Sequence, residues 1–171
     1  MTYLRKSFVK FLSLFLITTF LTVMLTLTQQ QIKEIADQLD SGMRCFLHKE
    51  TSELLFVPDI ENNPDIDEEL FEEELEELDN NFGDYVEIEK PASRDSFEVM
   101  ADFAEQLSDN VKLKTQLLQA LEKKHPFREF KFIVDNSGVY RQQWFDFKDS
   151  QLKQWVIDKF EQATDDDRDD D

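Results

Sequence analysis

Few side chains in this sequence are suited to nucleophilic catalysis at neutral pH, because that chemistry needs a base beside the nucleophile. The two histidines are His48 and His125, and His125 stands just before a predicted helix start, where a cap or surface residue is expected. Cys45, the single cysteine, alternates with Met43 and Leu47 on an apolar strand face. We therefore expect a buried structural thiol, no catalytic residue and a protein that is not an enzyme.

Metal and cofactor sites have no signature in the sequence either. There is no Cys pair or His pair at ligand spacing and no glycine-rich phosphate loop. The segment from Asp79 to Lys90 has the composition of a calcium loop, which needs Gly at its sixth position and Glu at its twelfth. Here Gly83 is fifth and Lys90 is twelfth, so we expect no metal ligand and no cofactor.

The densest charge in the chain is a run of carboxylates between residues 59 and 84. Apolar residues recur within it at helical spacing, which predicts an amphipathic helix over 65–82 with an anionic outer face. A general acid needs a pKa raised by burial, whereas these carboxylates should face water. The apolar stripe consists of Ile66, Leu70, Phe71, Leu75, Leu78 and Phe82. The carboxylates expected to form an interaction surface are Glu72, Glu73, Glu76 and Glu77.

Cations are concentrated instead in the C-terminal half, mixed with Phe and Trp. They are Lys112, Lys114, Lys123, Lys124, Arg128, Lys131, Arg141 and Lys148. Such a mixture can bind nucleic acid, or it can face the acidic helix of the same molecule and offset that helix's self-repulsion. We prefer the second arrangement, because nucleic acid would have to displace a tethered competitor. The candidate interaction cations are Lys123, Lys124, Arg128 and Lys131.

A small sheet and several helices must position these residues. Alternation over 43–48, followed by an apolar run at 54–57, predicts a hairpin, and 85–89 alternates as a third strand. Helical stripes account for most of the remaining chain. They predict helices from Thr28 to Gly42, from Ser93 or Asp95 to Leu107, from near Asp109 to Leu121 and from Pro126 to Gly138, then one with Trp144 and Phe147 and a last one over 152–160. The fold class is therefore α+β, a small antiparallel sheet packed with a mostly helical C-terminal half.

Length and composition limit the architecture and the partners. A chain of 171 residues predicts one domain, over 28–162, followed by an acidic tail at 163–171 expected to be disordered. Three Gly and four Pro argue against a sandwich or barrel with many tight turns. The net charge of −19 disfavours nonspecific nucleic-acid binding and favours basic partners. One cysteine allows no intrachain disulfide, which fits a reducing compartment.

The N-terminal segment 1–27 has two interpretations that stay open. Residues 11–27 are apolar and follow Arg5, Lys6 and Lys10, which predicts an uncleaved membrane anchor with its N-terminus inside. Alternatively, translation starts at Met24 and the protein is cytoplasmic, which is the preferred interpretation. A membrane partner follows only from the first, and the oligomeric state is undetermined by either.

Three segments resemble one known family. They are LDSGMRCFLHKETSELLFVPD at 39–59, SFEVMADF at 96–103 and HPFREFKFIVDNSGVYRQQWFDFKD at 125–149, and they are similar to Uncharacterised Protein Family 0158. The likeness covers roughly 29–160 and departs from the family at the apolar N-terminus, which members generally lack. The resemblance implies a small bacterial α+β protein. It implies no activity, because the family has no assigned catalytic or ligand-binding residues.

Two functions follow as hypotheses. The first is a non-enzymatic protein-interaction module whose acidic helix binds a basic protein partner. The alternative is a nucleic-acid-associated regulatory protein in which the acidic helix masks a basic, aromatic surface.

Overall fold

The computed structural model describes residues 26–60, 62 and 65–169, and its first helix is α2 (Gln29–Asp40). Thr28 caps this helix as predicted, because its hydroxyl accepts the Gln31 N–H at 3.2 Å and the Gln31 side chain accepts the Thr28 N–H at 3.0 Å. Gly42 follows the helix with a φ of 92°, a left-handed conformation that glycine adopts without steric cost. The buried face of α2 is the predicted one, formed by Ile32, Ile35, Ala36 and Leu39.

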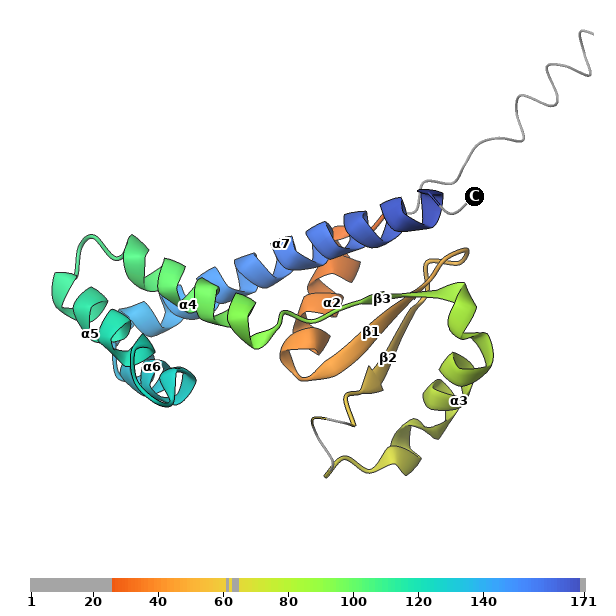
Figure 1. Cartoon of the computed structure of the whole chain (residues 1–171), viewed down its shortest axis with the longest axis horizontal. Coiled ribbons are helices and arrows are strands. Elements are labelled where there is room, and N and C mark those ends of the chain that lie inside the picture. Colours follow the sequence, from red (N-terminus) through yellow and green to blue (C-terminus); the bar gives the residue numbers. More distant parts are fainter. Residues whose placement is uncertain (1–25, 61, 63–64, 170–171) are drawn as a thin grey trace, which may run out of the picture.

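Three antiparallel strands follow, which confirms the predicted hairpin and third strand (Figure 1). They are β1 (Met43–His48), β2 (Leu54–Pro58) and β3 (Tyr85–Ile88), in the order β2-β1-β3. Cys45 of β1 lies opposite both Phe56 of β2 and Ile88 of β3, so β1 is the central strand. Because β1 is short and central, side chains on both of its faces are buried.

Helices cover both faces of this sheet. On one face, Cys45 and Ile88 pack with Ile35 of α2 and with Val156 of the last helix, α7 (Val139–Asp169). On the other face, Phe46 and Val57 pack with Leu78 of α3 (Glu72–Asn81), and Leu55, Leu75 and Tyr85 surround them. The acidic helix is therefore anchored to the sheet rather than to the helical half.

The acidic helix is shorter than the predicted range of 65–82. It begins with the 3₁₀ turn η1 (Glu68–Phe71), continues as α3 and ends in the 3₁₀ turn η2 (Phe82–Asp84). Of the predicted apolar stripe only Leu78 is buried, whereas Leu70 is 74% exposed and Phe82 is 61% exposed. A stripe spaced for 3.6 residues per turn is not preserved through 3₁₀ turns, which have three residues per turn. These two apolar side chains therefore stay on the surface among carboxylates.

The helical half begins with α4 (Ser93–Gln106), α5 (Val111–Leu121) and α6 (Pro126–Asp135). The Asp95 carboxylate accepts the Ala92 N–H at 2.8 Å, and Asn110 rather than Asp109 caps α5 by accepting the Leu113 N–H at 3.1 Å. Aromatic rings close the core: the Trp144 ring lies 5.0 Å from Phe130 and 5.2 Å from Phe103, in edge-to-face contact.

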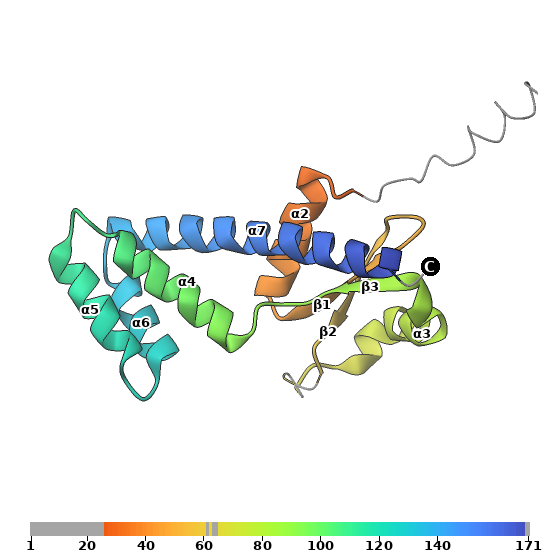
Figure 2. The ribbon, with the colours of Figure 1, turned by 45° about the horizontal axis from the view of Figure 1, so that its top comes forward.

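The two helices predicted at the C-terminus are one, α7, whose 31 residues include neither Gly nor Pro. Its first turns pack Tyr140, Trp144 and Phe147 against the core of α4, α5 and α6. Its later turns pack on α2 and β3, and the Trp155 indole N–H donates to the Glu89 carbonyl at 2.8 Å. Helix α7 thus joins the two halves (Figure 2), and it continues to Asp169, through most of the tail predicted to be disordered.

None of the helices in the described residues is both long and apolar enough to span a bilayer. The predicted apolar segment 11–27 lies outside those residues apart from its last two positions, so the membrane anchor stays a prediction.

The anchoring of α3 predicts unequal effects of two leucine truncations in the acidic segment. Leu78→Ala should lower the free energy of unfolding by about 2–3 kcal/mol, because it leaves a cavity beside Phe46. Leu70→Ala should change it by less than about 0.5 kcal/mol, because that side chain is exposed. Urea denaturation followed by circular dichroism measures both. Equal destabilisation by the two variants would contradict the packing described for α3.

Candidate functional site

The side chains best suited to act as nucleophiles or to transfer protons are Cys45, His48 and His125. Cys45 is completely buried, and burial, aided by the nearby Glu34 and Glu87 carboxylates, raises the pKa of its thiol to about 12. His48 Nδ1 accepts the N–H groups of Glu50 at 3.2 Å and of Thr51 at 3.3 Å, which tightens the hairpin turn. His125 precedes α6 and is exposed, without a capping hydrogen bond from its side chain.

Within the described part of the chain, no three His, Cys, Asp or Glu side chains lie close enough together to hold a metal ion. The carboxylates of α3 are numerous, but most of them are exposed on the outer side of the helix and do not converge on one point. The exposed surfaces of the described residues are therefore considered as candidates for function.

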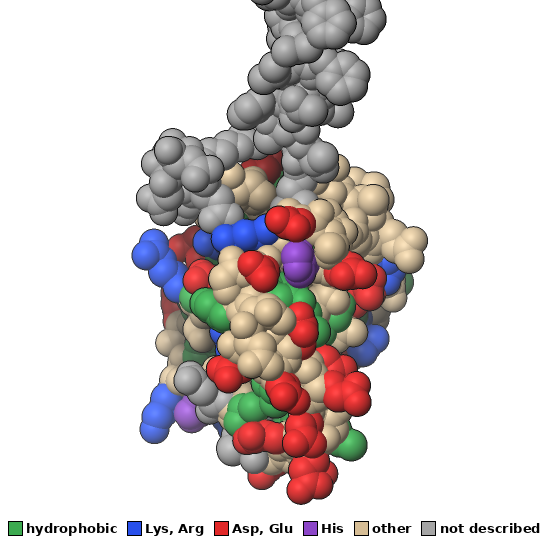
Figure 3. Space-filling view, turned by 90° about the vertical axis from the view of Figure 1, so that its right-hand side faces the viewer, with side chains coloured by type: hydrophobic (Ala, Val, Ile, Leu, Met, Phe, Trp, Pro, Cys, Tyr) green, Lys and Arg blue, Asp and Glu red, His purple; other side chains and the backbone are tan. Residues whose placement is uncertain are grey.

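The first candidate is the acidic surface, which we define as the exposed carboxylates of η1 and α3 together with Leu70 and Phe82. Figure 3 shows carboxylates gathered over the lower part of this end of the molecule, with hydrophobic side chains between them. Glu77 accepts hydrogen bonds from the Tyr85 hydroxyl at 3.1 Å and from the Asn81 amide at 3.0 Å. The other carboxylates have no ion-pair partner among the described residues. They are Glu68, Glu69, Glu72, Glu73, Glu76 and Asp79.

The second candidate is the basic corner, defined as Lys123, Lys124, Arg128 and Lys131 at the junction of α5 and α6. Lys123 Nζ lies 3.1 Å and Arg128 Nη2 lies 3.3 Å from the Glu129 carboxylate, and these two cations hold its pKa below the usual value. Lys124 and Lys131 form no ion pair with any described residue. Because Glu129 is the one described carboxylate that pairs with these four cations, the basic corner keeps an excess of positive charge.

The acidic surface and the basic corner lie at opposite ends of the molecule. Helix α3 lies at one end and α5 and α6 at the other in both ribbon views (Figures 1 and 2). The prediction that these cations face the acidic helix within one molecule is therefore wrong. Its physical reason is packing: the free face of the sheet takes the apolar side of α3, while α4 and the first turns of α7 hold α5 and α6 far away.

A groove of about 720 Å³ next to the basic corner was not predicted from the sequence. It runs between α4, α6 and α7 and reaches the end of α2, and its apolar lining includes Val99, Phe127, Phe145 and Trp155. Phe127 is 45% exposed and Phe145 is 37% exposed, which is unusual for large rings. The density of aromatic residues over 125–147 is the feature of the sequence that could have indicated this surface.

Besides Lys90, which pairs with Asp59, three cations line the groove, and two of these three are also paired. Arg141 Nε lies 3.2 Å from the Asp135 carboxylate and its guanidinium lies 4.7 Å from the centre of the Phe145 ring. Lys148 pairs with Asp40. Lys131, the third, is exposed and belongs to the basic corner, so the groove and the corner form one continuous surface.

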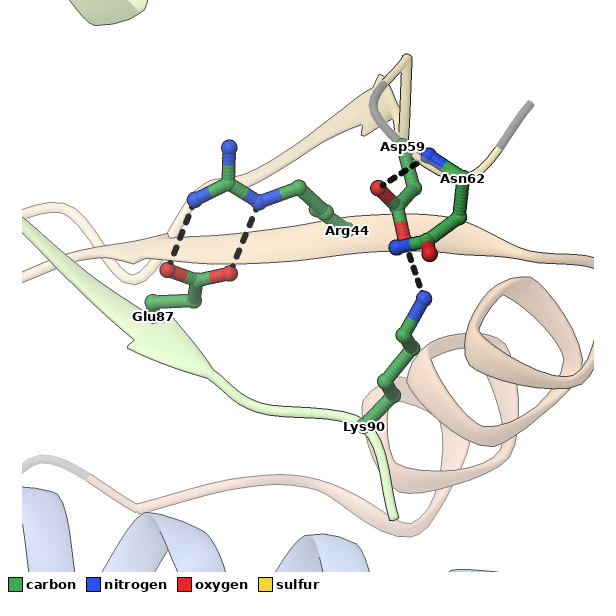
Figure 4. A network of polar contacts seen from close by, with 5 residues as sticks. All are labelled: Arg44, Asp59, Asn62, Glu87 and Lys90. Carbon is green, nitrogen blue, oxygen red and sulfur yellow. Dashed lines mark hydrogen bonds and ion pairs between the residues drawn. The ribbon is translucent and has the colours of Figure 1, made fainter. Parts of the chain in front are cut away.

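A polar network beside the sheet is structural (Figure 4). Arg44 on β1 makes two hydrogen bonds of 2.9 Å to the Glu87 carboxylate on β3. Asp59, the one charged residue buried in the described part of the chain, accepts the Asn62 amide at 2.8 Å and pairs with Lys90. This second contact ties the segment after β2 to the segment after β3.

The fold and these surfaces define a small α+β protein with charge concentrated at opposite ends. The chain belongs to the Uncharacterised protein family (UPF0158), whose model matches residues 22–166. This confirms the resemblance found in the sequence. No match was found among curated proteins or among solved structures.

The burial of Cys45 predicts that its thiol is inert in the folded protein. A thiol-reactive dye at pH 8 should label the native chain only as fast as the chain unfolds, because the thiolate is the reactive form and burial disfavours it. Intact-mass spectrometry over time measures the labelled fraction, and labelling in urea gives the fully reactive control. Rapid labelling of native protein would contradict the described core.

The Asp59 contacts predict a pH-dependent contribution to stability. Hydrogen bonds from Lys90 and then Asn62 lower the pKa of Asp59, so its stabilising effect is complete above the unfolded-state pKa of about 3.9 and is lost as pH falls through the folded value. The difference in unfolding free energy between wild type and Asp59→Asn should therefore be largest near neutral pH and shrink below about pH 4. Asp102→Asn, on the exposed face of α4, controls for the removal of one negative charge. A difference that stays constant with pH would contradict this role.

Proposed function

We propose that the protein is a non-enzymatic interaction module whose acidic surface binds a basic protein partner. One observation carries the proposal. Exposed carboxylates on η1 and α3 lack cationic partners among the described residues, and the same segment exposes the apolar side chains of Leu70 on η1 and Phe82 just after α3.

The two kinds of group have separate roles in such a contact. Carboxylates steer a basic partner toward the surface and disfavour acidic ones. Exposed apolar side chains supply the buried area on which affinity depends, since isolated surface ion pairs contribute little. Leu75 and Leu78 hold the helix on the sheet, so little conformational entropy is lost when a partner binds.

The chemistry of the candidate nucleophile and bases supports a role without catalysis. The Cys45 thiol is buried with a raised pKa, and His48 accepts backbone N–H groups in a turn. Neither side chain lines the groove.

The alternative is a nucleic-acid-associated regulatory protein, with Lys123, Lys124, Arg128 and Lys131 on phosphates. Lys124 and Lys131 favour it because they lack ion pairs to described residues, and Lys131 lines the groove together with the exposed ring of Phe127. The net charge of −19 opposes this alternative. In the structure the acidic helix and the basic corner lie at opposite ends of the molecule, so the helix does not mask these cations within one copy (Figure 1). A membrane-bound location is predicted only from the apolar N-terminal segment 11–27.

Titration with a fluorescent amphipathic peptide of Lys and Leu tests the proposed function. Glu72→Lys with Glu73→Lys should weaken peptide binding by at least about tenfold at moderate salt, because two attractive charges become repulsive. Asp102→Lys with Glu122→Lys changes the net charge equally at exposed positions outside the acidic surface and is the matched control. Equal weakening by both pairs would mean only nonspecific attraction to a polyanion.

Anisotropy with single-stranded RNA and duplex DNA separates the alternative function from the proposed one. Nucleic-acid binding that falls steeply with salt and is lost in Lys124→Glu with Lys131→Glu would favour the alternative. Absence of binding at about 0.05 M salt, where the Debye length is about 14 Å, would end it.

A further inference from the structure

We propose that the groove between α4, α6 and α7 receives the acidic surface of a second copy of this chain, so that molecules associate head to tail. This inference rests on the proposed function, because it uses the same acidic surface and names the groove and basic corner of another copy as the surface that it binds.

Charge complementarity is the first argument. Residues 65–79 hold ten Asp or Glu and no Lys or Arg, whereas residues 111–148 hold eight Lys or Arg and four Asp or Glu. Helix α7 keeps these two regions at opposite ends of the molecule (Figures 1 and 2), so they cannot meet within one copy. They can meet only between copies.

Apolar complementarity is the second argument. The groove exposes Phe127 and Phe145, and the acidic surface exposes Leu70 and Phe82. A groove of about 720 Å³ has room for a Leu or Phe side chain presented by a helix. Seating one of them against the rings removes apolar area of both copies from water, which is the main source of affinity in protein association.

The polar lining is compatible with an acidic helix. Four Asp residues line the groove. Asp40 and Asp135 are paired with Lys148 and Arg141, which reduces their repulsion toward incoming glutamates. Asp95 accepts the Ala92 N–H and Asp158 accepts the Gln154 side-chain amide, and the four lining cations balance the four carboxylates. Lys131 has no ion pair to a described residue, so it can meet a glutamate of the second copy without breaking an existing contact.

The geometry determines the kind of assembly. Two different surfaces meet, so the contact is heterologous, and a pair of copies retains one free groove and one free acidic surface. A single helix seated in a groove buries less area than a standard interface, so association should be weak and dependent on concentration.

Sedimentation velocity on the full chain tests this inference. At about 0.1 M salt, where the Debye length is about 10 Å, the average mass of the wild type should rise with concentration, because repulsion between whole acidic molecules is screened while interface contacts persist. At about 0.5 M salt the association should weaken by several fold as the contact charges are screened in turn.

Two blocking variants define the surfaces. The acidic-surface variant combines Leu70→Ser with Glu72→Lys and Glu73→Lys, and the groove variant combines Phe145→Ser with Lys131→Glu. Each alone should lose association by at least about tenfold. The acidic-surface variant carries less negative charge than the wild type, so general repulsion cannot explain its loss. Phe132→Ser with Lys112→Glu changes an exposed ring and a cation outside the groove and should associate as the wild type does.

Mixing the two blocked variants distinguishes head-to-tail docking from other pairings. An equimolar mixture should form dimers and nothing larger, because one variant keeps an intact groove and the other an intact acidic surface. Continued dimerisation of the acidic-surface variant alone would indicate groove-to-groove pairing and overturn the inference. A wild type that stays monomeric while still binding the Lys and Leu peptide would overturn the inference and leave the proposed function standing.

Discussion

The structure depends on the packing of one helix, α7, into two separate hydrophobic cores. Trp144 near its start meets Phe103 and Phe130, and Val156 further along meets α2 and the sheet. A helix of 31 residues spans about 45 Å at 1.5 Å per residue. Because Trp144 and Val156 are both fixed by packing in their cores, the sheet and the helical half cannot approach one another without losing one core.

That constraint explains the distribution of charge. The acidic helix covers the face of the sheet that α2 and α7 leave open, and the basic corner closes the far end of the helical half. Because they lie at opposite ends of the molecule (Figures 1 and 2), the two surfaces do not neutralise one another within one copy. These unneutralised, partly apolar surfaces of opposite charge are the basis of the proposed binding function.

Local patterns predicted the elements well, whereas long-range contacts were not predictable from them. Alternation around Cys45 gave the strand pairing, and Thr28 with Gly42 gave the limits of α2, since caps and turns depend on neighbouring residues. The continuity of α7 was missed because two differently oriented apolar stripes on one helix resemble two helices. The position of α3 relative to the cations was wrong because charge does not specify which apolar face a helix covers. The groove was missed because exposed and buried rings have the same sequence pattern.

The distance between the acidic surface and the basic corner in solution tests this account most directly. Glu73→Cys and Lys124→Cys provide two exposed labelling sites, and the native Cys45 is buried and should stay unlabelled. Dipolar spectroscopy on the doubly spin-labelled chain, diluted with unlabelled protein, should give one distance several times the ~10 Å Debye length, unchanged between low and high salt. A short distance that lengthens as salt rises would show that the two charged surfaces meet within one molecule.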